Sequence, residues 1–273
     1  MSIARKLFSI AGKDPAWDLS FASYSGVSFD VSTQDAGARG LYFKDDGTKM
    51  YFVGVGFRNV YEYDLSTAWD VSTASYVQGF SIGSQEAFAN GLFFKPDGLK
   101  MYIVGSSGDD VNEYDLSTAW DVSTASYSQN FSVASQETSP AGLFFKPDGL
   151  KMYVLGSTGD AVYEYDLSTA WDVSTASYSQ NFSVASQETI PTGLFFKPDG
   201  LKMYVVGLIG DDVNEYDLST AWDVSTASYS QNFSISSQES SPYGLFFKPD
   251  GTNMYILGNA NDTVYSYTLG PQD

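Results

Sequence analysis

The sequence predicts an all-β fold, a β-propeller of five blades in which each blade is a sheet of four antiparallel strands. The first observation is a repeat, because the block Gly-Leu-(Phe/Tyr)-Phe-Lys recurs at a constant interval along the 273 residues. The second is the content of each repeat, which holds four short strand-like segments separated by glycine and proline turns. Four-stranded repeats with a period of about 50 residues are typical of propeller blades. The five copies begin at Gly40, Gly91, Gly142, Gly193 and Gly244.

The second copy shows how a repeat forms a blade. Segments 91–95 and 100–105 are apolar on successive residues, as expected for strands covered on both faces. The Pro-Asp-Gly at 96–98 between them is typical of a hairpin turn. Segment 111–116 is the expected third strand. In 125–133, apolar residues alternate with serine and asparagine, which indicates an outer strand with one solvated face.

The two ends of the chain complement each other, which is the third observation. The last copy stops after its third strand, near Gly270, and lacks the tryptophan-containing segment and the fourth strand. Those pieces stand at the N-terminus instead, in segments 16–18 and 22–31. We therefore expect the first segment to complete the fifth blade and close the ring, whereas a solenoid would need capping repeats. This assigns 1–14 to an N-terminal extension and 15–273 to the propeller.

Composition excludes several classes of function. The chain has 33 acidic and 14 basic side chains, and its net charge of −19 argues against nucleic acid or an anionic membrane as a partner. The absence of cysteine excludes disulfides and thiolate chemistry, and the absence of histidine removes the Ser-His-Asp triad and most zinc sites. The sequence therefore predicts a non-enzymatic protein with no cofactor and no metal. No stretch approaches the ~20 apolar residues of a membrane span, and the apolar run after Arg5 and Lys6 is too short for a convincing signal peptide.

The repeat also resembles known propeller families. Lys-Pro-Asp-Gly-x-Lys-Met-Tyr-Val-x-Gly, followed by Asp-x-Val-x-Glu-Tyr-Asp-Leu-Ser-Thr, is similar to the repeats of the YVTN and NHL-like propellers. More closely, it resembles five-fold propeller repeats of marine bacteria and their bacteriophages. Over roughly 15–273, that resemblance implies a recognition or structural module, such as a virion accessory or host-surface-binding protein in a virion or extracellular setting. The locally basic 1–14 would then be a contact for virion assembly.

Variation among the copies points to one face of the ring. We define the top face as the connections between second and third strands together with the blade-to-blade crossovers. Copies 142–192 and 193–243 differ at ten positions, of which eight lie in or beside these connections. Arginine and aromatic residues, which often anchor interfaces, occur there. The predicted binding residues, for a protein or a cell-surface glycan, are Arg39, Phe57, Arg58, Phe88, Asn90, Leu208, Ile209 and Tyr243. The alternative is drift in permissive loops after duplication.

A ring of tryptophans supports a second hypothesis, a lectin with five equivalent sugar sites. Exposed indoles on the opposite, bottom face could stack on sugar rings, whereas the structural alternative is that each indole plugs the base of its blade. The tryptophans are Trp17, Trp69, Trp120, Trp171 and Trp222.

A ring of carboxylates leaves two further alternatives. Directed into the channel, these groups could bind a hard cation, and otherwise they are solvated or accept backbone N–H bonds. A glycosidase or lactonase-type enzyme is the least favoured function, because no acidic pair stands out and the histidine or metal chemistry of lactonase-like propellers has no counterpart here. The carboxylates are Asp35, Glu86, Glu137, Glu188 and Glu239.

Overall fold

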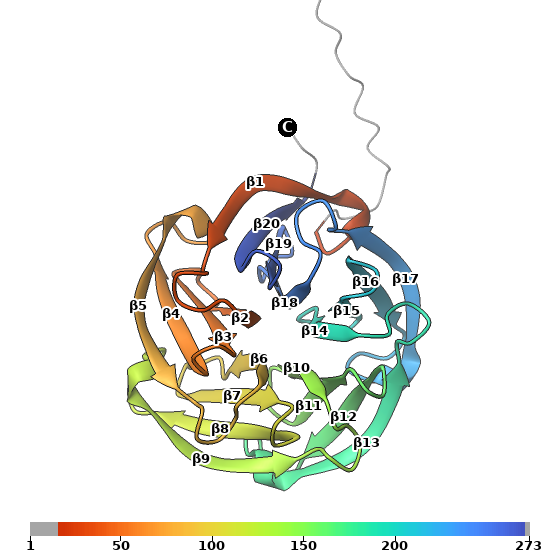
Figure 1. Ribbon diagram of the computed structural model, residues 1–273. Helices are drawn as coiled ribbons and strands as arrows, with labels where there is room; N and C mark the ends of the chain where they lie inside the picture. The colour runs from red at the N-terminus through yellow and green to blue at the C-terminus, as the bar shows by residue number, and fades with distance from the viewer. Residues whose placement is uncertain (1–15, 271–273) are drawn as a thin grey trace, which may run out of the picture.

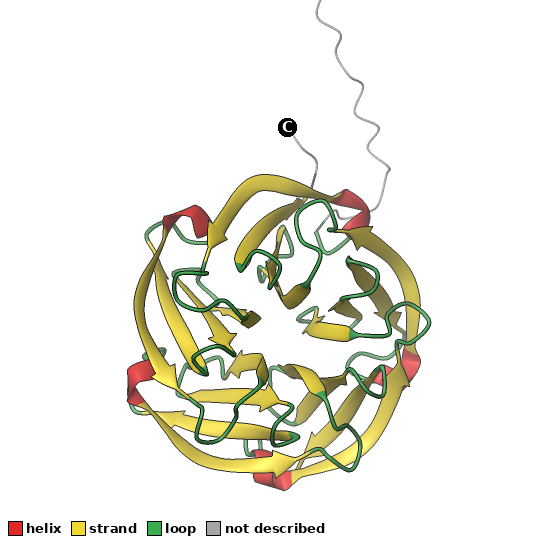
Figure 2. Ribbon diagram, in the orientation of Figure 1, coloured by secondary structure: helices red, strands yellow, loops and turns green. Residues whose placement is uncertain are grey.

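The computed structural model describes residues 16–270 and contains five four-stranded antiparallel sheets around a central axis (Figure 1). Each sheet runs from an inner strand beside the axis to an outer strand at the periphery, so the predicted five-bladed β-propeller is confirmed. Helical structure in this part of the chain consists of short 3-10 turns that lie on the periphery (Figure 2). These turns are η1 (Leu19–Phe21), η2 (Val71–Thr73), η3 (Val122–Thr124), η4 (Val173–Thr175) and η5 (Val224–Thr226). The proposed extension, 1–14, lies outside the described residues.

The strands occupy equivalent places in every blade. The inner strands are β2 (Ala38–Phe43), β6 (Ala89–Phe94), β10 (Pro140–Phe145), β14 (Pro191–Phe196) and β18 (Pro242–Phe247). The second strands are β3 (Lys49–Gly54), β7 (Lys100–Gly105), β11 (Lys151–Gly156), β15 (Lys202–Gly207) and β19 (Asn253–Gly258). The third strands are β4 (Asn59–Leu65), β8 (Asp110–Leu116), β12 (Ala161–Leu167), β16 (Asp212–Leu218) and β20 (Thr263–Leu269). The outer strands are β5 (Ala74–Ser81), β9 (Ala125–Ser132), β13 (Ala176–Ser183), β17 (Ala227–Ser234) and β1 (Ala22–Asp30).

The ring is closed by the N-terminal strand, as the chain ends predict. Strand β1 pairs with β20 in the sheet β1-β20-β19-β18, beginning with Ala22 opposite Leu269. The register shifts between Tyr24 and Ser28, where the sequence carries one residue more than the other copies. Gly26 has φ = +83° at this point, a backbone conformation that glycine adopts without a steric penalty. The extra residue is therefore absorbed as a local bulge, and pairing continues on both sides of it.

On the bottom face, side-chain packing joins the hairpin between the first two strands to the tryptophan segment. The indole of Trp120 lies over Gly98, which has φ = +73°, and a Cβ added to that glycine would stand 2.4 Å from the indole Nε1. The backbone N–H of Trp120 also donates to Gly98 O at 3.0 Å. Tyr51 of the preceding blade donates through its hydroxyl to Trp120 O at 2.7 Å. One tryptophan therefore connects two turns of its own blade and the blade before it.

Buried glutamates make a second connection between adjacent blades. Glu62, on β4, accepts hydrogen bonds from Lys49 Nζ at 2.6 Å, Gln78 Nε2 at 2.9 Å and, across the blade boundary, Val122 N at 3.1 Å. The equivalent glutamates 113, 164 and 215 repeat this arrangement. In the fifth blade Ser266 stands at the glutamate position. The boundary between the fifth and first blades therefore differs from the other four.

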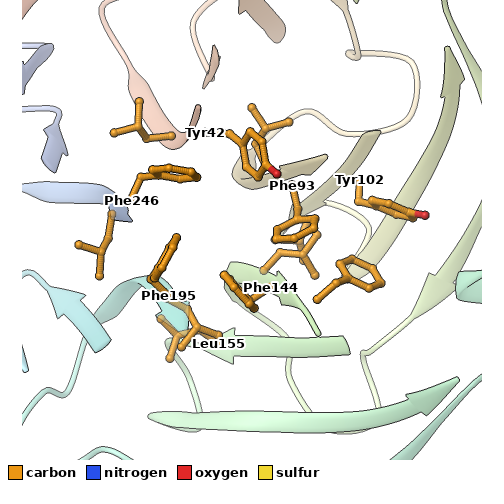
Figure 3. Close-up of a cluster of buried hydrophobic side chains, with 14 of the residues drawn as sticks. Tyr42, Phe93, Tyr102, Phe144, Leu155, Phe195 and Phe246 are labelled. Carbon is orange, nitrogen blue, oxygen red and sulfur yellow. The ribbon is translucent and has the colours of Figure 1, made fainter. Parts of the chain in front are cut away.

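Aromatic and leucine rings fill the axis. Neighbouring aromatic side chains of the inner strands meet edge to face, with centroids 5.2 to 5.3 Å apart (Figure 3). Leucines one residue earlier form a second ring towards the top, and the spaces on its two sides are about 20 Å³ each. The two ends of the axis consequently carry separate cavities. The aromatic ring consists of Tyr42, Phe93, Phe144, Phe195 and Phe246, and the leucine ring of Leu41, Leu92, Leu143, Leu194 and Leu245.

Candidate functional site on the top face

The top end of the axis carries a hollow of about 160 Å³. Its wall is built from backbone contacts that recur in every blade, because each loop between the second and third strands bonds to the preceding crossover. An example is the 3.1 Å hydrogen bond from Ser106 N to Phe88 O. The side chains that project from this common scaffold differ from blade to blade. They are Arg39, Asn90, Ser106, Ser139, Ala141, Ser157, Ile190, Thr192, Leu208 and Tyr243.

The structure brings together four of the eight residues predicted from the sequence. Arg39, Asn90, Leu208 and Tyr243 line the hollow. The other four lie on the surrounding loops outside the lining, with exposed fractions of 70% for Phe57, 53% for Phe88 and 62% for Ile209, and with Arg58 also exposed. These loop residues could meet a large partner, whereas the four lining residues could hold a small group.

Sequence reasoning missed several lining residues that occupy the same repeat positions as the predicted ones. Ala141 and Thr192 correspond to Asn90, and Ser106 and Ser157 correspond to Leu208. The signal that could have found them is this equivalence of position. The prediction favoured large or charged side chains and left out these smaller ones at the equivalent positions.

Arg39 is the charged residue of the lining. Its Nη1 donates to Asn90 Oδ1, and its Cζ lies 4.6 Å from the centroid of the Tyr243 ring. Desolvation lowers the pKa of Arg39 from its ordinary value, although a guanidinium stays protonated at neutral pH. The buried Nε has no hydrogen-bond partner among the described residues. A buried unpaired donor is costly, so the guanidinium of Arg39 is not fully satisfied by the protein itself, and an acceptor group of a ligand that met it in the hollow would gain a charge-assisted bond.

Other polar side chains of the hollow are held by backbone carbonyls of the next blade. Asn90 Nδ2 donates to Pro140 O at 2.9 Å, and Thr192 Oγ1 donates to Pro242 O at 2.7 Å. Ser157 Oγ lies 3.0 Å from Ser139 Oγ, so hydroxyls gather in this part of the lining. Ile190 and Leu208 contribute apolar surface elsewhere in it. The hollow therefore combines one cation, several hydroxyls and an apolar patch.

The carboxylate ring supports the top face from inside. Glu86 Oε1 accepts from Phe88 N at 2.7 Å and Ser107 N at 3.1 Å, and Oε2 accepts from Gly108 N at 3.3 Å. In the first blade Asp35 accepts equivalent bonds, including 2.8 Å from Phe57 N. The five carboxylates are 0 to 2% exposed. Of the alternatives, the structure shows the one in which they accept hydrogen bonds from backbone N–H groups. No group of three acidic side chains suited to a metal ion occurs among residues 16–270.

The tryptophan ring lies in packed surroundings. Trp17, Trp120, Trp171 and Trp222 are 7 to 9% exposed, and Trp69 is half-buried. Their indoles stack on aromatic side chains of the inner strands, as Trp171 does on Phe93 with centroids 6.3 Å apart. This arrangement corresponds to the plug at the base of each blade and leaves little ring surface for a sugar.

Comparison with known proteins supports the fold. No model of a protein family matches the sequence, and no curated protein matches it. Among solved structures, a functionally unknown protein from Desulfotomaculum acetoxidans aligns with a TM-score of 0.51 and 16% identity, over 85% of this chain and 68% of its own. A “putative 6-phosphogluconolactonase” from Bacteroides uniformis aligns with a TM-score of 0.53 and 13% identity, over 82% of this chain and 64% of its own.

These likenesses concern the propeller architecture. At 13 to 16% identity they carry no residue roles to this chain. The resemblance to YVTN and NHL-like repeats and to repeat proteins of marine bacteriophages stays a prediction. A propeller of this kind is compatible with a binding or structural module, and no helix within 16–270 is long and apolar enough to cross a membrane.

Proposed function

We propose that the protein is a recognition module whose top-face hollow binds one hydrogen-bond-accepting group of a partner, such as a carboxylate on a cell-surface glycan or protein. The observation that carries this proposal is the guanidinium of Arg39 in the wall of the hollow, which the acceptors of the protein itself do not fully satisfy. Asn90 and Tyr243 hold the guanidinium in place, so the site is organised before the ligand arrives. The resemblance to bacteriophage repeat proteins would place such a partner on a host surface or in a virion.

The size of the hollow suits a single residue of a larger molecule. An apolar cavity of about 150 Å³ accommodates benzene, so about 160 Å³ takes one sugar ring or one side chain. Exposed Phe57 and Ile209 on the surrounding loops would add contacts outside the hollow. We therefore expect a partner that inserts one group at the axis and lies across the loops.

Recognition is favoured over catalysis by the chemistry of the lining. A hydrolase needs a general base or an activated water, and the described lining contains neither a carboxylate nor a lysine. The likeness to the “putative 6-phosphogluconolactonase” supports the architecture, and its identity of 13% supplies no catalytic residue for this chain. The sugar-stacking alternative at the tryptophans would need indole surface that packing covers.

The experiment is a glycan array that includes uronic and sialic acids, probed with the purified full chain, Arg39→Ala and Arg58→Ala. The two variants lose the same charge from the same face, and Arg58 lies outside the hollow, so it is a matched control. We expect binding to acidic glycans that falls by about tenfold or more in Arg39→Ala and by at most about twofold in Arg58→Ala, whose side chain would contact only the part of a ligand outside the hollow. Equal losses in both variants would attribute binding to the charge of the face and contradict the assignment to the hollow.

A further inference from the structure

The bottom end of the axis carries a second pocket, of about 240 Å³, on the other side of the aromatic and leucine rings. The aromatic ring forms its floor, and Figure 3 shows Tyr42, Phe93, Phe144, Phe195 and Phe246 around a central space. The residues that follow the inner strands form its rim. Because the two rings lie between the cavities, this pocket is distinct from the top-face hollow.

The lining is almost entirely aromatic and prolyl. Further aromatic side chains, which include Phe145, Phe196 and Trp171, also line the pocket. Four blades contribute a proline to the rim, which makes most of it apolar. These are Pro96, Pro147, Pro198 and Pro249. Aromatic walls attract organic cations through the negative potential of the ring faces, and they also accommodate apolar groups.

The first blade departs from the pattern at two positions. It has Tyr42 where the other blades have phenylalanine, and Asp45 where they have proline. The Tyr42 hydroxyl donates to Phe94 O at 3.0 Å and is thereby satisfied. The Asp45 carboxylate lines the pocket and has no hydrogen-bond or ion-pair partner among residues 16–270.

The charges next to Asp45 are already paired. Lys44 Nζ lies 2.7 Å from Asp46, which also accepts from Thr48 N at 3.0 Å. In the other hairpins the lysine that precedes the proline likewise pairs with the aspartate that follows it, at 2.7 to 2.8 Å. Asp45 is therefore the carboxylate of the rim that is available to a ligand, on a protein whose net charge of −19 attracts cations.

We propose that the bottom pocket binds a compact organic cation, a molecule with an ammonium or trimethylammonium head and a small apolar or aromatic body. The body enters the aromatic pocket, and the head lies near Asp45 at the rim. An apolar cavity of about 150 Å³ holds benzene, so about 240 Å³ has room for a benzene-sized body and a head of a few atoms.

The test is calorimetric titration of the full chain with benzyltrimethylammonium, benzyl alcohol and phenylacetate, which share an aromatic body and differ in charge. We expect the cation to bind most tightly and the anion least. Weak binding that is equal for the three compounds, or no binding of the cation at millimolar concentration, would overturn the proposal.

Variants locate the binding at the rim. Asp45→Asn is expected to weaken binding of the cation by about five- to tenfold and to leave benzyl alcohol unaffected. Asp64→Asn removes the same charge from an exposed site of the same blade that is outside the pocket lining, and it leaves Lys49 paired with Glu62, so it should change affinity by less than about twofold. Pro96→Asp, which adds a second carboxylate at the equivalent rim position, should tighten binding. Equal effects of Asp45→Asn and Asp64→Asn would contradict a direct contact with Asp45.

Discussion

The backbone of each end of the propeller repeats from blade to blade, and the two ends differ in how side chains stabilise it. At the bottom, side-chain packing adds to the backbone hydrogen bonds of the turns, as when the indole of Trp120 covers Gly98. At the top, the loops are held by backbone hydrogen bonds and by one buried carboxylate per blade, such as Glu86. Side chains whose packing stabilises the turns cannot be replaced freely, so the residues of the bottom face are almost the same in every copy. Side chains that project from a backbone scaffold can change, and at the top they do.

This comparison separates variation from function. Loops held by their backbone tolerate many side chains, so differences among the copies alone do not identify a site. Arg39 is distinguished by geometry instead, because its Nε is buried without a partner while its other contacts orient it. The bottom pocket is the converse case, in which one substitution, Asp45 for proline, stands out against a uniform background.

The largest effect is expected at the bottom hairpin. Gly98→Ala should lower the free energy of unfolding by about 3 kcal/mol, since the new methyl group meets the Trp120 indole and φ = +73° disfavours alanine. The control is Gly108→Ala in an exposed top loop, where the added Cβ meets the carboxylate of Asp110 rather than backbone. It should cost less than about 1 kcal/mol. Denaturant unfolding of both variants measures the difference, and similar losses would contradict the contrast between the two ends.

Removing a carboxylate of the top scaffold should have the next largest effect. Glu86→Ala leaves the N–H groups of Phe88, Ser107 and Gly108 without their acceptor, at a cost of about 2 kcal/mol, because water can reach part of this loop. Hydrogen exchange should show faster exchange at these amides and little change at the bottom of the same blade. The exposed Asp64→Ala is the control for charge. Unchanged exchange at the three amides would disprove the supporting role of Glu86.

Acidification should affect the contributions of Asp97 at the bottom and Asp110 at the top to stability with opposite sign. At the bottom, desolvation is outweighed by hydrogen bonds from Lys95 and Leu99, so the pKa of Asp97 is lowered and the stability it contributes is lost as pH falls through that lowered value. At the top, desolvation and the nearby Glu86 and Asp109 raise the pKa of Asp110, so its protonation removes a penalty. Carboxyl-detected NMR titration should show Asp110 protonating at higher pH than Asp97. The reverse order would contradict the electrostatic difference.

The smallest effect concerns the aromatic contact of Arg39. Tyr243→Phe keeps the ring beneath the guanidinium and should change affinity for an acidic glycan by less than about twofold. Tyr243→Ala removes the ring and should weaken binding by about fivefold. Surface plasmon resonance on a glycan identified with the array measures both. Equal losses in Tyr243→Phe and Tyr243→Ala would show that the hydroxyl, and not the ring, matters.

The fold could be predicted because the chain contains five copies of one unit, and these copies can be compared with one another. Turn residues such as Gly98 and the complementary chain ends determine strand number, register and closure with local chemistry. The hollow could be predicted in part, since Arg39 and Tyr243 stood out by residue type. Sequence could not show that Phe57 and Phe88 lie outside the lining, because the direction of a loop side chain depends on tertiary contacts. The sequence also gave no sign of the bottom pocket, because the type of an apolar strand residue does not show whether packing leaves a cavity beside it.

The most direct test of the account is the stoichiometry of ligand binding, measured by native mass spectrometry on the full chain with an acidic glycan from the array. A top-face recognition module with one arginine in its hollow predicts one glycan per chain at saturation, and a clearly lower occupancy in Arg39→Ala at the same glycan concentration. Close to five glycans per chain would contradict the account, because it would place binding on the repeated features of the bottom, such as the tryptophans, rather than on the unequal side chains of the top.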